Sequence, residues 1–189
     1  TIDIRVAEAK FIRSLSFFYL VQQFGDIPMP LVETNSANKE VTRVPSAEVY
    51  AQIITDLTEA EAALPVSSSN YGRATKGAAQ HLLARVYLTR GWNFNNALGG
   101  TAADFTSARE YADKVIVAYP MVADYKDLFP KKSEDPTNQT HGPGDQNAKN
   151  SEIVFAVQHS DQALTNELEL DDLSGSSING DGGNNSHSI

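Results

Sequence analysis

The sequence predicts a mainly α-helical protein made of helical hairpins, with long loops and at least one short strand. Three observations lead to this fold class. Four segments of the 189-residue chain repeat apolar residues at spacings of three and four, the period of an amphipathic helix. A glycine or proline lies at the end of each segment or directly after it, where such residues end helices. One further segment, residues 152–159, alternates in the manner of a strand.

The first predicted helix covers residues 4–24. Gly25 follows it and can adopt the left-handed conformation that ends a helix, and Asp26 is expected to shape the turn. A polar connector over residues 31–44 leads to the next element. The apolar stripe that we expect to be buried consists of Ile4, Ala7, Phe11, Ile12, Leu15, Phe18 and Tyr19.

The second predicted helix covers residues 47–64 and ends at Pro65. Ser46 is predicted to be its N-cap, because a serine hydroxyl can accept a hydrogen bond from a first-turn amide. The expected buried residues are Val49, Tyr50, Ile53, Ile54, Leu57, Ala60 and Leu64. Three carboxylates fall off this stripe and are expected on a solvated face, without a role in acid–base chemistry: Asp56, Glu59 and Glu61.

The third predicted helix covers residues 76–91 with Thr75 as its N-cap, and the fourth covers residues 103–119 and ends at Pro120. The expected buried residues of the third helix are Ala79, Leu82, Leu83, Val86 and Tyr87. Those of the fourth are Phe105, Ala108, Ala112, Val115, Ile116 and Tyr119.

Residues 1–129 therefore form a predicted helical region, and residues 130–189 a loop-rich segment. The latter contains the strand near residues 152–159 and, from residue 174, a Gly-, Ser- and Asn-rich tail that is typical of a long loop or a disordered end. A single strand needs a partner, and the chain begins without Met, so we expect it to be part of a longer protein.

Composition excludes several classes of function. The 24 Asp and Glu exceed the 15 Lys and Arg, and no basic cluster is present, which argues against nucleic-acid binding. Without Cys there is no disulfide, thiol nucleophile or Cys-ligated metal, and no apolar run is long enough to span a bilayer.

Catalytic and cofactor motifs are also missing from the sequence. The four histidines are scattered, and we find neither a phosphate-binding glycine loop nor a serine nucleophile elbow. Residues 179–182 (NGDG) share features with calcium loops but lack the alternating acids and the final Glu. The prediction is a protein that is not an enzyme and has no cofactor, with calcium left open.

The third and fourth helices have the pattern of a tetratricopeptide hairpin. Leu83, Ala84 and Tyr87 match its first helix. Ala108 and Pro120 have the spacing of its second helix, and Ala112 lies at the closely packed site between them. The link is about a dozen residues too long, so residues 91–102 are interpreted as an insertion.

An ordered series of short motifs resembles the SusD/RagB family over residues 7–158. No single motif is specific, but their order is. They are AEAKFIR at 7–13, FGDIP at 24–28, Arg43, PS at 45–46, EVY at 48–50, Ile54, DL at 56–57, AALP at 62–65, GRATKGAA at 72–79, LLARVYL at 82–88, YADKVI at 111–116 and SEIVF at 151–155.

This resemblance implies a fold of tetratricopeptide-like helix pairs and a non-catalytic, nutrient-binding role. Members of the family are lipoproteins on the extracellular face of the Bacteroidetes outer membrane, anchored through an N-terminal lipidated Cys that this chain lacks. They bind glycans or other nutrients and pass them to a SusC-like TonB-dependent transporter. Family members are considerably longer, and their binding sites lie largely on variable loops.

The candidate ligand-binding residues are Trp92 and Asn93 in the insertion, and Tyr71 and Arg73 before the third helix. A flat aromatic ring can cover sugar C–H groups, and amide or guanidinium groups can bind hydroxyls. The alternatives are that Trp92 is buried against the hairpin, since Trp is mostly buried in proteins, and that Arg73 secures the loop by bonding a carboxylate or carbonyls.

Two other functions compete with glycan binding. The first is a protein-interaction scaffold that holds a peptide on the concave face of the repeats. The second is a glycan-processing enzyme, which needs two carboxylates held several ångströms apart, and the sequence offers no persuasive pair.

Overall fold

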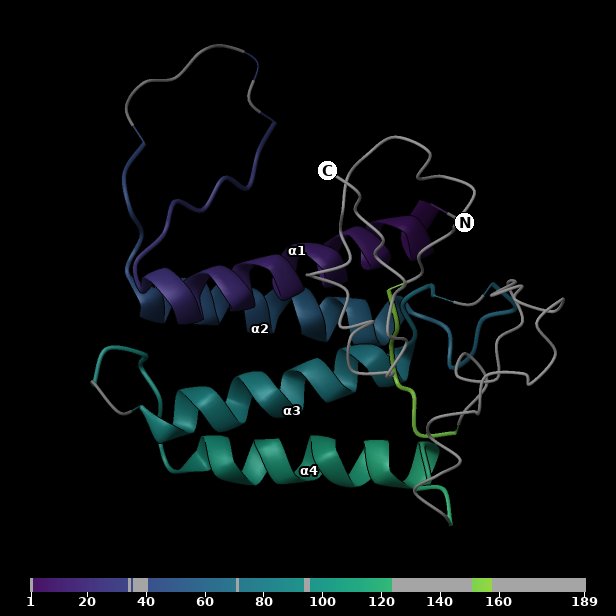
Figure 1. Cartoon of the computed structure of the whole chain (residues 1–189). Coiled ribbons are helices and arrows are strands. Elements are labelled where there is room, and N and C mark those ends of the chain that lie inside the picture. Colours follow the sequence, from purple (N-terminus) through teal and green to yellow (C-terminus); the bar gives the residue numbers. More distant parts are fainter. Residues whose placement is uncertain are drawn as a thin grey trace, which may run out of the picture. The chain divides into compact units, whose positions relative to one another are not determined.

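The computed structural model describes residues 2–33, 35, 41–70, 72–93, 96–123 and 151–157. Within these ranges it contains the four predicted helices: α1 (Ile2–Phe24), α2 (Ser46–Ala63), α3 (Lys76–Trp92) and α4 (Ala103–Ala118). Figure 1 shows that successive helices run in opposite directions, so that α1 with α2 and α3 with α4 form two hairpins. The predicted all-α fold of helical hairpins is thereby confirmed.

Contacts divide the chain into two compact units, of which the first contains all four helices. It comprises Thr1–Met121 and Val154–Ala156, and the second comprises Val122–Ile153 and Val157–Ile189. The predicted boundary between residues 129 and 130 lies outside the described residues and stays a prediction. In the second unit, the Val122 amide donates to Glu152 Oε1 at 2.6 Å.

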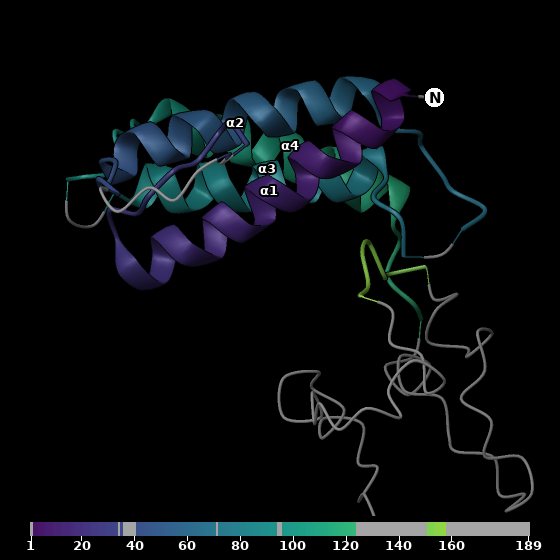
Figure 2. The same ribbon diagram turned by 90° about the horizontal axis from the view of Figure 1, so that it is seen from above.

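The helices pack in chain order, with α2 and α3 in the middle and α1 and α4 outside. The closest packing joins α1 to α2, α2 to α3 and α3 to α4, and Figure 2 shows α1 crossing the other helices at an angle. The largest fully buried side chains come mainly from α1 and α2 and include Phe11, Phe18, Tyr50, Ile53 and Leu57. These are residues that the helical period assigns to the core.

Some apolar residues expected in the core are exposed instead. Ile12 and Tyr19 of α1 and Phe105 and Ile116 of α4 are open to solvent, with Ile116 exposed to 67%. The reason is position in the layer: an outer helix packs mainly against one neighbour, so its buried stripe is narrower than its apolar stripe.

The expectation that Asp56 lies on a solvated face of α2 is wrong, because Asp56 is only 2% exposed. Arg13 of α1 donates to both of its carboxylate oxygens, from Nε at 2.8 Å and from Nη2 at 2.7 Å. Gln52 Nε2 adds a third hydrogen bond at 3.0 Å. Because α1 covers this side of α2, a carboxylate there must be paired, and Arg13 supplies the opposite charge.

Helix α2 begins differently from the prediction. Ser46 is its first helical residue and not its N-cap, and Pro45 occupies the cap position without a side-chain hydrogen bond. Asp26 Oδ1, twenty residues earlier, accepts from both the Ser46 amide and the Ser46 hydroxyl at 2.8 Å. Asp26 therefore does more than shape a turn, because its negative charge also suits the positive end of the helix dipole.

The connector between α1 and α2 is closed at its base. Gly25 takes φ +68° directly after α1, as predicted. Ile27 and Val44 then form an isolated antiparallel bridge, in which the Val44 amide donates to the Ile27 carbonyl at 2.8 Å. The two ends of the connector are thus tied together at Ile27 and Val44.

The hairpin of α3 and α4 packs closely, as the tetratricopeptide pattern predicts. The rings of Tyr87 and Tyr111 stack with centroids 5.9 Å apart. A Cβ on Gly77 would collide with the ring of Tyr119, whose hydroxyl lies 3.2 Å from the Thr75 hydroxyl. Thr75 caps α3 as predicted, accepting from the Ala78 amide at 3.3 Å.

The predicted strand near residues 152–159 is absent from its described part. Residues 151–157 have no strand, and residues 158–159 and the tail lie outside the described residues. Val154 and Phe155 pack against the helical core, and the Phe155 ring meets Phe11 edge-on with centroids 5.0 Å apart. In the described part no neighbouring strand pairs with this segment, and the Phe155 ring packs on α1 instead.

Candidate functional site

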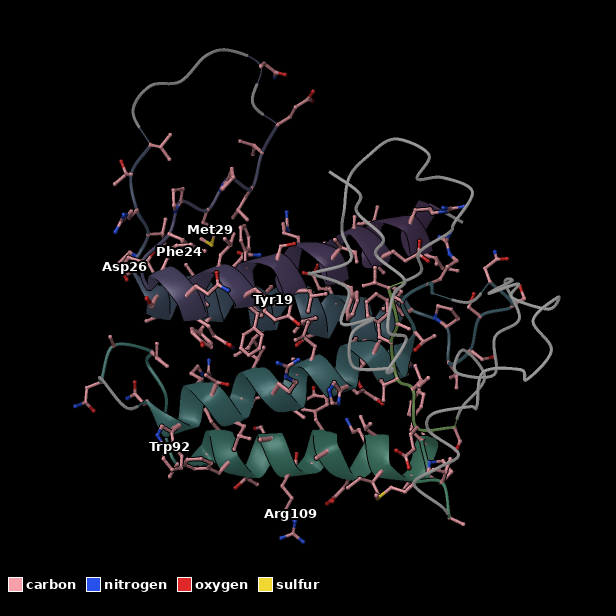
Figure 3. All side chains as sticks on the ribbon, viewed as in Figure 1. Tyr19, Phe24, Asp26, Met29, Trp92 and Arg109 are labelled. Atoms are coloured by element: carbon pink, nitrogen blue, oxygen red, sulfur yellow. The ribbon has the colours of Figure 1, made fainter. Side chains whose placement is uncertain are left out.

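Three of the predicted ligand-binding residues are described by the structure, and Arg73, Trp92 and Asn93 lie at the two ends of α3. Arg73 precedes this 17-residue helix, and Trp92 is its last residue. At about 1.5 Å of rise per residue the helix is about 25 Å long, so Arg73 and Trp92 do not share a site for one or two sugar rings. Figure 3 shows Trp92 at the far end of α3, near the first turn of α4.

Arg73 is used to hold α1 against the segment before α3. Its Nε donates to Glu8 Oε1 at 2.7 Å, and its Nη2 pairs with the other oxygen of the same carboxylate. This two-point contact matches the alternative in which Arg73 secures the loop. Tyr71 lies outside the described residues.

Trp92 is not buried against the hairpin, because the residue is 71% exposed. The residue ends α3 and precedes the insertion. A large aromatic side chain that is open to solvent at a helix end has the exposure that a sugar-stacking platform requires. The alternative of a buried, loop-sealing Trp92 is wrong.

Asn93 forms the C-cap of α3 in the left-handed conformation, with φ 39° and ψ 43°. Its side-chain Oδ1 accepts from the Leu98 amide at 2.9 Å, and its backbone carbonyl accepts from the Asn96 amide at 2.9 Å. The side-chain oxygen is therefore already used within the protein.

Asp104, which sequence reasoning missed, connects the insertion to both helices. It lies in the first turn of α4 and is 3% exposed. Arg90 donates to its two oxygens at 3.1 Å and 2.5 Å, and the Thr101 amide donates to Oδ2 at 2.8 Å. One sequence signal could have identified it. An acidic residue in the first turn of a helix can accept hydrogen bonds from backbone amides that have no partner within the helix.

Two opposing effects set the pKa of Asp104. Burial alone would raise it, but hydrogen bonds from Arg90 and from the Thr101 amide stabilise the carboxylate. The net result is a pKa below the ordinary 3.8. The carboxylate therefore stays ionised at neutral pH, which suits an ion pair and not a general acid.

The described residues contain no group of three or more His, Cys, Asp or Glu side chains that could hold a metal ion. The calcium-like loop at residues 179–182 lies outside them. No helix in the described part of the chain is both long and apolar enough to cross a membrane.

The fold defines a scaffold of tetratricopeptide-like hairpins, and comparisons with known proteins identify its family. Residues 3–88 match the SusD-like family described as "Starch-binding associating with outer membrane". A SusD-like protein of Bacteroides ovatus is 36% identical over 136 residues, which cover 68% of this chain and 24% of that protein. The starch-binding protein SusD of Bacteroides thetaiotaomicron is 31% identical and covers 70% of this chain and 23% of its own length.

A solved structure with xylogluco-oligosaccharide is also similar. It is 32% identical with a TM-score of 0.60, and the match covers 67% of this chain and 26% of that one. The chain belongs to the SusD-like family. It spans about a quarter of the length of the curated relatives it matches.

Proposed function

We propose that this protein binds a glycan at the bacterial cell surface without catalysing a reaction. Family membership is the observation that carries the proposal: relatives that match about two thirds of this chain include a starch-binding protein and a structure with xylogluco-oligosaccharide. The role of the helices is to hold loops and helix ends in fixed places, from which side chains reach the ligand.

Within this chain, Trp92 is the side chain best suited to contact a sugar. Its ring is large, mostly exposed, and attached to the end of a helix whose buried face packs in the core. Sugar rings present C–H groups on one face, and an indole ring covers such a face with dispersion contacts and loss of water. We therefore propose a platform at the C-terminal end of α3, while Arg73 serves the scaffold.

Intrinsic fluorescence tests this proposal directly, because Trp92 is the only Trp in the chain. Maltoheptaose and a xylogluco-oligosaccharide are titrated into the protein, and emission is followed together with heat release. We expect a shift in Trp92 emission with one of the two ligands. Trp92→Ala should weaken its binding about tenfold, and Trp92→Phe should weaken it less, because a smaller aromatic face remains.

Tyr19→Ala is the matched control, because Tyr19 is an exposed aromatic on another helix. It should change the affinity by less than about twofold. Equal affinities in Trp92→Ala and the wild type would remove Trp92 from the site.

We further propose that the full-length protein is lipid-anchored on the outer face of the outer membrane and delivers its ligand to a SusC-like TonB-dependent transporter. The family description of association with the outer membrane supports this location. Affinity purification of the full-length protein from mildly solubilised outer membranes tests it. The expected co-purifying protein is a large outer-membrane transporter.

The absence of catalysis is part of the proposal. The buried carboxylates Asp56 and Asp104 and the partly buried Glu8 are each paired with an arginine, so each of these carboxylates is used in an ion pair of the scaffold. Incubation of the purified protein with the bound glycan should release no reducing sugar. Turnover would favour a glycan-processing enzyme instead.

A peptide-binding scaffold is the second candidate, and one observation favours it. The Arg85 guanidinium of α3 lies over the Phe18 ring of α1, 5.5 Å from its centroid, so the first helices of the two hairpins meet. Next to this contact Tyr19 and Leu88 are exposed, and Figure 3 shows Tyr19 on the side of α1 nearer to α3. The purification described above should recover a soluble peptide or protein, and no barrel, if this candidate is correct.

A further inference from the structure

Residues close to Trp92 in the sequence make contacts that hold the C-terminal end of α3 in place. Asn93 is in the left-handed region at φ 39°, which a non-glycine residue adopts at a cost that Asn bears better than most. Its amide donates to the Thr89 carbonyl at 3.4 Å and completes the last helical turn. Trp92 thus stays on a closed turn.

The same asparagine ties this turn to the returning loop. Asn93 Oδ1 accepts from the Leu98 amide at 2.9 Å, and the Leu98 side chain is 6% exposed within the hydrophobic core. One hydrogen bond therefore joins the residue after Trp92 to a loop residue that is anchored by burial.

The loop beyond Leu98 presses back onto α3. Gly99 has φ +68°, and a Cβ on Gly100 would overlap the carbonyl of Arg90. Arg90 itself is fixed by its ion pair with Asp104. Both sides of the Asn93–Leu98 hydrogen bond are thus held by independent contacts, and the backbone around Trp92 has little freedom.

We propose that Asn93 is a positioning residue for Trp92 and not a ligand contact. This inference rests on the proposed function, since it assumes that Trp92 stacks on the glycan. A ring on a fixed helix end has fewer orientations open to it than a ring on a frayed one, so it loses less conformational freedom on binding, and affinity is higher when Asn93 holds the helix end. Asn93 thereby leaves the set of predicted ligand-binding residues and acts through its neighbour.

Two substitutions separate the hydrogen bond from the backbone conformation. Asn93→Gly keeps the left-handed residue but removes the acceptor for the Leu98 amide. Asn93→Asp retains a carboxylate oxygen at the acceptor position. Time-resolved fluorescence anisotropy of the single Trp reports the order of its ring without ligand, and titration with the oligosaccharide bound by the wild type reports affinity.

In Asn93→Gly we expect faster loss of Trp92 anisotropy and affinity lower by about threefold to tenfold. Asn93→Asp should restore both to within about twofold of the wild type. Thermal unfolding of both variants shows whether the helical scaffold is intact. If Asn93→Gly unfolds at a lower temperature than the wild type, the anisotropy and affinity of Asn93→Asp decide whether Asn93 positions Trp92.

Unchanged anisotropy in Asn93→Gly would overturn the positioning role, whatever the affinity. Lower anisotropy with unchanged affinity would overturn it too, provided that Trp92→Ala weakens binding. If Trp92→Ala leaves binding unchanged, the proposed glycan contact is wrong, while the anisotropy comparison still shows whether Asn93 orders the ring.

Discussion

Arg13 of α1 and Asp56 of α2 are joined by two hydrogen bonds of 2.8 and 2.7 Å, although 43 residues separate them in sequence. Asp56 is buried and Arg13 is about one-third exposed (32%). The pair connects the two helices of the first hairpin, so the orientation of α1 on α2 depends on a charge interaction as well as on apolar packing.

Asp56→Ala should destabilise the protein by about 2 kcal/mol. Breaking a fully buried pair costs about 3–5 kcal/mol, and the partial exposure of Arg13 reduces this because water can solvate the remaining charge. Urea unfolding followed by circular dichroism measures the change. As a control, Asp113→Ala removes the exposed, 3.7 Å pair with Arg109 and should change stability by less than about 0.5 kcal/mol. Equal effects in the two variants would contradict a structural role for Arg13–Asp56.

Gly100→Ala should be more destabilising than Gly77→Ala. A Cβ at Gly100 would overlap the backbone carbonyl of Arg90, whereas a Cβ at Gly77 would meet the end of the Tyr119 side chain. A side chain can rotate away and the backbone of α3 cannot, so we expect about 3 kcal/mol for Gly100→Ala and about 1 kcal/mol for Gly77→Ala. Thermal unfolding of both variants gives the order, and the reverse order would show that the loop shifts more readily than Tyr119.

Ser14→Ala should leave the protein as stable as the wild type or make it more stable by about 1 kcal/mol. Ser14 is buried on α1, and its hydroxyl has no hydrogen-bond partner among the described residues. Removing a buried hydroxyl without a partner also removes the cost of withdrawing it from water. Ser16→Ala is the control, since Ser16 is exposed and its hydroxyl donates to the Ile12 carbonyl at 3.0 Å. A loss of more than about 1 kcal/mol in Ser14→Ala would show that the hydroxyl is bonded in solution.

The Asp104 contacts predict a contribution to acid sensitivity. Its pKa in the folded protein is lower than the ordinary 3.8, so its stabilising effect is complete above that value and is lost as pH falls through the lower, folded value. Unfolding temperatures are compared at neutral pH and in steps below about pH 4. Asp104→Asn should lower the unfolding temperature at neutral pH and flatten the decline in acid. A decline as steep as that of the wild type would assign acid sensitivity to other groups, such as Asp26, whose pKa is also lowered, chiefly by its hydrogen bond from Ser46.

The helices were predictable because their signals are local. The 3.6-residue period, Thr75 as a cap and Gly25 as a stop each act within a few residues of the feature they determine, and the bounds of all four helices were predicted to within two residues. The tetratricopeptide pattern also succeeded, since small residues at fixed spacing report close approach between two neighbouring helices.

Features that depend on distant neighbours were not predictable in the same way. Asp56 has the period of a solvated face, and only the position of α1 makes it buried. Asp26 caps a helix that begins twenty residues later. The alternation at residues 152–157 predicts a strand, but side chains that alternate can equally pack on a helix when no strand is beside them.

For the candidate site, the sequence placed Trp92 and Asn93 together but could not assign their roles. The exposure of Trp92 follows from its place at the last turn of α3, beyond the packed seam. The side-chain bond of Asn93 to Leu98 depends on loop geometry, which no periodicity encodes. Arg73 was recognised as a loop-securing residue, yet its partner Glu8 is 65 residues away.

Residues 28–43 are closed at their base, so the surface that this segment presents can change without a change in the packing of α1 on α2. Because the Ile27–Val44 bridge and the Asp26–Ser46 contacts close the segment where it meets α1 and α2, we expect changes in its length beyond Met29, which packs on the core, to leave both helices undisturbed. Each doubling of such a loop costs only about 0.6 kcal/mol of closure entropy. Substitutions and insertions in this segment can therefore give the protein a new surface chemistry on the same helical frame.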